Sequence, residues 1–180
     1  MVRKSTASLI WLALLLSSVD ASRQRPGQTR SKAPLLFEAQ PLRQTVREGE
    51  PIHLRFRLTN IGNKDVLVNR HFRLFDLVDL RIVGQTGQRV EWCGVIPQIV
   101  DTPGAFILLA PRAHVEKVLL VSCDKDARWG YAFPGPGQYE VTATYQLHYP
   151  LNFLREAARS ALVVKGLVVA KSIQVRVEPP

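Results

Sequence analysis

Apolar and polar residues alternate along most of the chain from Leu35 onward, which is the pattern of β-strands with one buried and one solvated face. In PIHLRFRL the apolar side chains run in steps of two from Ile52 to Leu58, and the intervening ones are His53, Arg55 and Arg57. VDLRIVG and SIQVRVEPP alternate in the same way, and turn-forming runs such as NIGNKD and GQTGQ separate such segments. About seven to nine short strands with frequent turns predict an all-β fold, an antiparallel β-sandwich.

One segment departs from this alternation. LNFLREAARSALVV places apolar residues at helical spacing between Leu151 and Leu162 and is rich in Ala, Leu and Arg. Pro150 precedes it and Gly166 follows it, so we expect a short amphipathic helix inserted before the last strand. The helix either caps one end of the sandwich or presents a partner-binding face that includes Arg155 and Arg159.

The N-terminus has the pattern of a secretory signal peptide. Arg3 and Lys4 precede a short apolar run, and Val19 and Ala21 are small residues at the positions that a signal peptidase accepts. The apolar run is shorter than the roughly 20 residues that a membrane span needs. We therefore expect residues 1–21 to be removed and the protein to be exported to the periplasm or the extracellular space. The alternative is a buried N-terminal helix.

Residues 22–34 form a basic segment with four cations and no acids. Its Pro, Gly and Gln content predicts a disordered leader, which either adheres to polyanions or is a solvated linker. Removal of residues 1–21 would change the formal net charge from +9 to +8, because two cations and one acid are lost. Residues 35–180 remain as a single sandwich domain.

The chain has two cysteines, Cys93 and Cys123. An even number in an exported chain favours a disulfide, which would stabilise a loop of this length by roughly 3–4 kcal/mol. The alternative is two free, buried thiols.

The segment FPGPGQYEVTATYQL carries a resemblance to a known fold. Gly137, Tyr139, Val141 and Ala143 follow one another in steps of two, which resembles the Gly-x-Tyr-x-Cys-x-Ala run of immunoglobulin-type domains. The resemblance implies that Tyr139 pins a corner through a hydrogen bond to upstream backbone, with Val141 in place of the cysteine.

A second segment, GEPIHLRF, resembles strand B of the same fold, with Phe56 in place of the other cysteine. The resemblance implies that Phe56 and Val141 meet across the two sheets. The strand C tryptophan of antibody domains is absent, which excludes a close antibody relative. From about Leu35 to Pro179 the chain resembles Ig-like domains of exported bacterial proteins and, more weakly, the intracellular proteinase inhibitor family, which shares the Pro-Gly-x-Tyr corner. No inhibitory-loop motif is found, so no functional residue carries over, and the motifs specify fold better than activity.

The sequence lacks the residue patterns of the common catalytic sites. The four histidines include no pair two or four residues apart, so a zinc site is unsupported. No G-x-S-x-G elbow or Gly-rich phosphate loop occurs, and Asp124 and Asp126 lack the rest of a calcium loop. We therefore predict that the protein is not an enzyme and uses no cofactor or metal.

Binding is the function that we expect. The aromatic series Trp129, Tyr131 and Phe133 is either a stacking surface for a sugar or peptide, or the inward face of a strand. The long loop Gly94–Phe106 is a candidate docking or inhibitory loop. Outward basic residues add a positive field that suits acidic partners, and these are Arg55, Arg57, Arg81 and Arg89.

These features predict an exported, non-catalytic module that recognises a protein or an anionic envelope polymer through its end loops. The alternatives are a passive structural or accessory cell-envelope domain and a proteinase-inhibitor-like module. Nucleic-acid recognition is not expected, because no stacking motif lies on a basic strand face and the chain is predicted to be exported. The oligomeric state cannot be inferred from the sequence.

Overall fold

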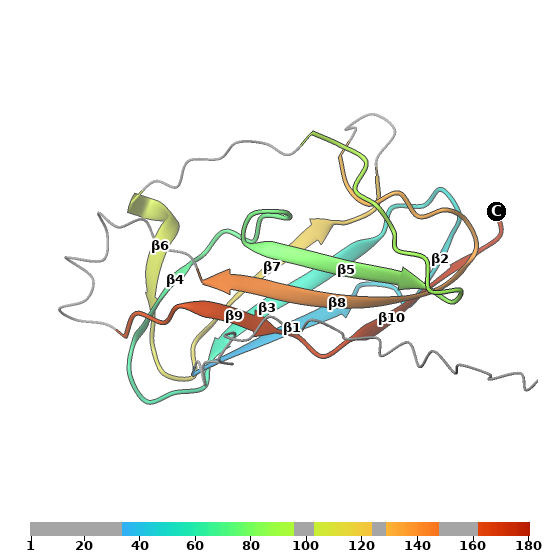
Figure 1. Ribbon diagram of the computed structural model, residues 1–180. Coiled ribbons are helices and arrows are strands. Elements are labelled where there is room, and N and C mark those ends of the chain that lie inside the picture. The colour runs from blue at the N-terminus through green and yellow to red at the C-terminus, as the bar shows by residue number, and fades with distance from the viewer. Residues whose placement is uncertain (1–33, 96–102, 124–128, 148–161) are drawn as a thin grey trace, which may run out of the picture.

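The protein is described by a computed structural model that covers residues 34–95, 103–123, 129–147 and 162–180 (Figure 1). Within these ranges there are ten β-strands, no α-helix, and one 3-10 turn at Pro103–Ala105. The strands are β1 (Leu35–Pro41), β2 (Thr45–Arg47), β3 (His53–Asn60), β4 (Val66–Asn69), β5 (Val78–Gly84), β6 (Phe106–Leu109), β7 (His114–Leu120), β8 (Gly137–Leu147), β9 (Gly166–Val169) and β10 (Ile173–Glu178). The prediction of an all-β sandwich is confirmed.

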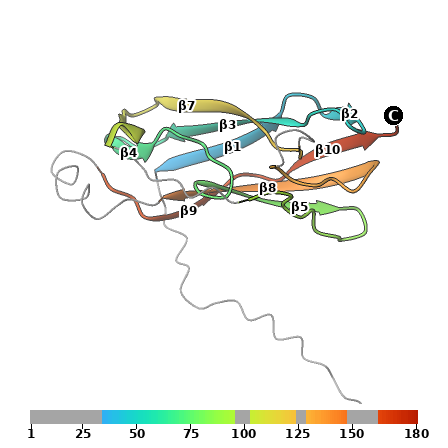
Figure 2. The ribbon, with the colours of Figure 1, turned by 90° about the horizontal axis from the view of Figure 1, so that it is seen from above.

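Two sheets form the layers of the sandwich, which Figure 2 shows from above. One sheet has the order β1-β3-β7, and the other has the order β2-β10-β8-β5, with β9 pairing the far half of the long strand β8. Strands β4 and β6 pair with each other near the β9 end of the molecule (Figure 1). The pairings between these strands are antiparallel except that of β2 with β10, which is parallel.

Strand alternation produces the core that lies between the layers. In β8 the residues at every second position from Tyr139 to Leu147 are buried, and their neighbours face outward. In β3 the same holds for Leu54, Phe56 and Leu58, each at most 1% exposed. The two apolar faces meet, and apolar burial of this kind is the main force that holds a sandwich together.

Aromatic rings connect the layers. Phe37 of β1 stacks on Phe56 of the same sheet at a centroid distance of 5.9 Å and contacts Tyr145 of the opposite sheet at 5.6 Å. Phe72 contacts both Phe37 and Tyr145. Phe56 and Val141 are both fully buried on opposite sheets, and the aromatic connection between those sheets runs through Phe37.

The structure corrects the sequence interpretation in several places. The described residues alone form ten strands, more than the seven to nine predicted, because the short strand β2 and strand β9 were not anticipated. Strand β2 makes the parallel pairing. The segment RVEW, which follows the GQTGQ turn, is no full strand and forms only isolated bridges. Leu162, the expected end of the inserted helix, is instead extended and bridges Val66 in parallel.

Other predictions lie outside the described residues. These are the signal peptide and the basic leader, most of the expected helix including Arg155 and Arg159, and the middle of the Gly94–Phe106 loop. In the part of the chain that the structure describes, no helix has the length and hydropathy to cross a membrane.

Candidate binding site

At one end of the sandwich a short extended segment, Gly130–Ala132, links the two sheets. It lies between two other chain segments and is hydrogen-bonded to both. On one side the amide of Cys93 donates to the Gly130 carbonyl and the amide of Ala132 donates to the Glu91 carbonyl, both at 2.9 Å. On the other side the amide of Tyr131 donates to the Val121 carbonyl at 2.7 Å. The amide of Cys123 also donates to the Tyr131 carbonyl, at 2.9 Å. Because Val121 follows β7 and Glu91 follows the hairpin after β5, this segment connects one sheet to the other.

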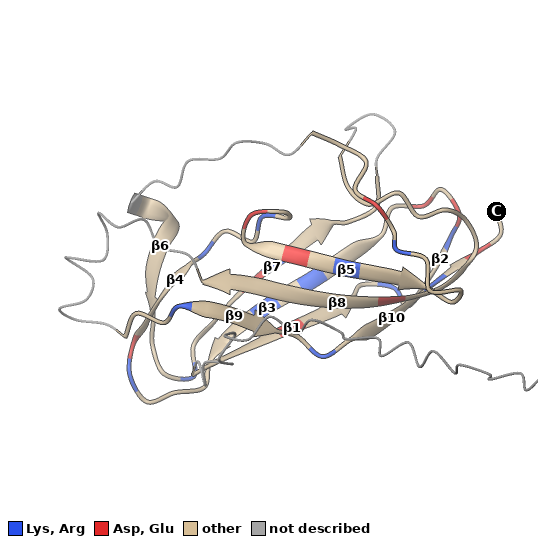
Figure 3. Ribbon diagram, viewed as in Figure 1, with Lys and Arg blue, Asp and Glu red and all other residues tan. Residues whose placement is uncertain are grey.

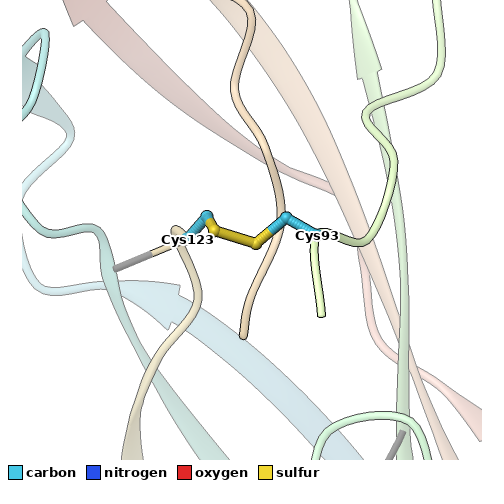
Figure 4. Close-up of a disulfide and its surroundings, with 2 residues drawn as sticks. All are labelled: Cys93 and Cys123. Atoms are coloured by element: carbon cyan, nitrogen blue, oxygen red, sulfur yellow. A yellow bond between two sulfur atoms is a disulfide. The ribbon is translucent and has the colours of Figure 1, made fainter. Parts of the chain in front are cut away.

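The disulfide between Cys93 and Cys123 connects the two flanking segments (Figure 4). Their Cα atoms are 6.2 Å apart, and 30 residues separate them in the sequence. The predicted disulfide is therefore confirmed. We call this region, comprising Phe75, Glu91–Cys93, Val121–Cys123 and Trp129–Phe133, the disulfide end.

Gly130 is required for the close approach of these segments. Its φ is +132°, and a Cβ built on it would lie 2.5 Å from the carbonyl oxygen of Ser122. That contact is far inside van der Waals distance and involves backbone, so it cannot be relieved by a side-chain rotation. A residue with a side chain at position 130 would push the two segments apart.

Four aromatic side chains pack together at the disulfide end around Trp92. Its ring lies 4.4 Å from that of Phe75, 5.3 Å from that of Tyr131 and 6.2 Å from that of Trp129. Tyr131 is 2% exposed, whereas Trp129 is 43% exposed. The aromatic series suggested by the sequence is therefore divided, because Tyr131 belongs to the core and Trp129 lies at the surface.

The hydroxyl of Tyr131 reaches β5, where it accepts a hydrogen bond from the amide of Leu80 at 3.3 Å. Burial raises the pKa of Tyr131 to about 12, opposed by the bond from Leu80, with smaller effects of Asp79 and Arg89. Tyr131 is therefore neutral at physiological pH and holds two chain segments together.

Two members of this aromatic group were not identified from the sequence. Trp92 directly precedes Cys93, and that neighbour was the one available signal. Phe75 has a φ of +71°, which is unusual for a bulky residue, and no feature of the hydrophobic pattern indicates it. The turn is held by the amide of Phe75, which donates to the Val78 carbonyl, and by an ion pair between Arg73 and Asp76.

The indole N–H of Trp92 is buried, and among the described residues it has no hydrogen-bond partner. Buried donors are nearly always paired in native proteins, so an exception calls for an explanation. The indole ring that carries this unpaired N–H belongs to the same group of four rings as the exposed Trp129.

A cleft of about 580 Å³ borders the same segment. Its wall includes apolar residues from both sheets and two acids from the β2–β3 turn, among them Glu48, Glu50, Ile52, Leu120, Phe133 and Val177. Because Tyr131 and Phe133 line the cleft, the connecting segment forms part of its wall.

The turn before β8 forms another part of the cleft wall through Phe133 and Gly135. The hydroxyl of Tyr139 donates to the carbonyl of Gly135 at 2.6 Å, and the ring of Phe133 packs edge-on against that of Tyr139 at 5.0 Å. Burial, followed by the nearby Glu48 carboxylate, raises the pKa of Tyr139. Gly137 begins β8 directly after the turn.

The outward basic residues do not form one positive surface. Arg55 and Arg57 both lie against Glu116, with N–O distances of 3.4 and 2.6 Å, and the hydrogen bond from Arg57 is the largest cause of the lowered pKa of Glu116. On β5 the acidic Asp79 and the basic Arg81 lie two positions apart, and Figure 3 shows one acidic and one basic segment on this strand. A general attraction to polyanions therefore has little support from these strands.

Among the residues that the structure describes, no three His, Cys, Asp or Glu side chains come together as a metal-binding group. In comparisons with known proteins, the chain matches no protein-family model and no curated protein.

Proposed function

We propose that this protein is an exported, non-catalytic binding module that recognises a partner protein through its disulfide end. The observation that carries the proposal is the position of Trp129, whose indole is 43% exposed although it packs against the ring of Trp92. Tryptophan is enriched among the residues that dominate the binding energy of protein interfaces.

The surroundings of Trp129 favour binding because they are held in place before a partner arrives. Gly130, the next residue, is hydrogen-bonded to Cys93, and the disulfide connects Cys93 to the segment on the other side. A side chain held in this way loses little conformational entropy on binding.

The arrangement of strands supports the proposal that the sandwich is of the Ig type. The orders β1-β3-β7 and β5-β8-β10 are similar to the A-B-E and C-F-G strand orders of that fold. The bond from Tyr139 to the Gly135 carbonyl has the form of the tyrosine corner. Loops at the ends of such sandwiches often carry recognition.

Export is part of the proposal. A disulfide persists in oxidising compartments, and residues 1–21 have the pattern of a secretory signal. In this proposal the protein acts in the periplasm or outside the cell.

Affinity capture from envelope extract with the secreted protein tests this function. We expect saturable capture of a particular protein, identified by mass spectrometry and then purified for a binding titration. Trp129→Ala should weaken binding at least about tenfold with an unchanged thermal midpoint. Leu36→Ala is the matched control, since Leu36 is 44% exposed but lies on β1.

Three other results would contradict the proposal. Uniform, salt-sensitive adhesion that Trp129→Ala does not alter would favour a passive envelope domain. Inhibition of a proteinase that survives Trp129→Ala would favour an inhibitor acting through another surface. Hydrolytic activity that depends on one acidic or histidine side chain would make the protein an enzyme.

A further inference from the structure

Strand β7 is an edge of its sheet, and one row of its backbone groups is unpaired. The amide of Val121 donates to the Ile52 carbonyl. Together with the register of β7 and β3, this bond determines which residues of β7 direct their N–H and C=O groups towards β3. Val115, Lys117 and Leu119 therefore bond to β3, and the N–H and C=O groups of Glu116 and Val118 point away from it. No hydrogen bond to these outward groups is found in the described part of the chain.

The side chains of this edge are also uncovered. Glu116, Lys117 and Val118 are all exposed, and Val118 is 41% exposed although it is apolar. A long edge with free backbone groups is a template for pairing with another extended chain. The seven residues of β7 are long enough for a strand of ordinary length to add to them.

The core-facing side chains of β7 indicate what kind of strand fits. Val115 and Leu119 are half-buried apolar residues, and Lys117 lies between them, in register with Phe56. Lys117 has no ion pair within the described residues. On the opposite face, Glu116 is already neutralised by Arg55 and Arg57. The unpaired charge of this edge is therefore positive and lies between two apolar positions.

We propose that β7 binds an extended segment of a partner protein by strand addition. The segment carries an acidic residue beside Lys117 and apolar residues two positions before and after it. The main-chain bonds supply affinity and the alternate side chains supply selectivity. This inference concerns a surface separate from the disulfide end and does not depend on the proposed function.

Lys117 also argues against a second copy of this chain as the occupant. Antiparallel self-pairing centred on β7 would place the two Lys117 ammonium groups opposite each other, and like charges directly opposite are destabilising. A core-facing charge on an edge strand is one way in which proteins prevent edge-to-edge association. An acidic residue in the added strand turns this repulsion into attraction.

Amide exchange measured by NMR with a capped peptide of sequence STVTETVTS tests the inference. In the free protein, we expect slow exchange for the amides of Val115, Lys117 and Leu119 and fast exchange for those of Glu116 and Val118. The peptide should slow exchange at Glu116 and Val118. Fast exchange at both amides with saturating peptide would overturn the proposal.

Two variants make the test specific. Val118→Pro removes one outward N–H, and proline is tolerated on an edge strand where the N–H faces solvent. It should weaken peptide binding by about tenfold or more while the rest of the spectrum is retained. The unaltered protein should prefer the peptide with the central glutamate. The Lys117→Glu variant should reverse this preference and bind STVTKTVTS several-fold better than STVTETVTS.

The remaining outcomes are equally decisive. Equal binding of both peptides by the unaltered protein, or full binding by Val118→Pro, would overturn strand addition at this edge. Sedimentation that shows a dimer abolished by Val118→Pro would identify a second copy as the occupant and also overturn the proposal. Trp129→Ala should leave peptide binding unchanged, so the two proposals fail independently.

Discussion

The hydroxyl of Tyr131 accepts a hydrogen bond from the backbone amide of Leu80 at the open edge of β5. The register of β5 with β8, set by the bond from the Gln146 amide to the Leu77 carbonyl, directs the Leu80 amide away from β8. Leu80 is fully buried, so its amide requires a partner from the protein. A side chain therefore occupies the place that a neighbouring strand would otherwise fill.

Tyr131→Phe should destabilise the protein by about 1–3 kcal/mol, because the Leu80 amide would remain buried without an acceptor. The ring contacts with Phe75 and Trp92 would be retained, so the loss reports on the hydroxyl. Urea unfolding at neutral pH measures the change. A free energy of unfolding within about 0.5 kcal/mol of the unaltered value would show that this bond is not important.

Alkaline pH should destabilise the protein through the same residue. Below pH 10 Tyr131 is protonated in both the folded and the unfolded state, so it gives no pH dependence. Above pH 10 the unfolded state loses the proton first, because the folded pKa is about 12, and stability falls as pH rises towards that value. We expect a loss on the order of 2–3 kcal/mol over this range.

Tyr131→Phe is the control for this titration and should flatten the alkaline decrease. Tyr139 also has a raised pKa, so a smaller decrease should remain in that variant. Urea midpoints measured soon after each pH jump give the comparison. An unchanged alkaline slope in Tyr131→Phe would contradict the assignment.

The sequence predicted well which side chains of the longer strands are buried, because this depends only on their position within the strand. The alternation in β3, β8 and β10 reports directly which face is buried, since side chains of a strand alternate between the two faces. Strand β9 was not predicted, because its neighbours in sequence suggested a helix. Strand β2 has only three residues, too few for a periodic pattern to be recognised.

The disulfide end was predicted only in part because it depends on contacts between distant segments. Trp129 and the two cysteines were identified from residue type. The roles of Phe75 and Trp92 follow from rings that meet across turns, and no local spacing encodes such a meeting. The sequence likewise left the orientation of Tyr131 open, which the bond to Leu80 decides.

The corner and the core should differ in their sensitivity to substitution. Tyr139→Phe removes the hydrogen bond to the Gly135 carbonyl and should cost about 1–2 kcal/mol. Phe56→Ala opens a cavity in a fully buried position and should cost about 3–5 kcal/mol. Urea midpoints that move further for Tyr139→Phe than for Phe56→Ala would contradict this order.

Gly130 and Gly135 offer a matched pair of glycine substitutions. Their φ angles are similar, +132° and +139°, so alanine introduces similar backbone strain at both positions. Only at Gly130 does the new methyl group collide with backbone, whereas at Gly135 its nearest neighbour is the Glu48 carboxylate at 3.8 Å. We expect Gly130→Ala to be less stable than Gly135→Ala by about 1–3 kcal/mol in thermal or urea unfolding. Equal losses of stability in the two variants would show that Gly130–Ala132 and Val121–Cys123 can move apart without a free-energy cost.

Removal of the disulfide should weaken both the stability and the proposed binding. The double variant Cys93→Ala, Cys123→Ala releases a loop of 30 residues and should lose roughly 3–4 kcal/mol, while β-type circular dichroism is retained. Its Trp129 fluorescence anisotropy should fall, because Gly130 is held between the two bonded segments. Trp92→Phe in both backgrounds reduces the overlapping tryptophan signal. An unchanged anisotropy in the double variant would show that backbone hydrogen bonds alone position Trp129 and that the disulfide contributes only to stability.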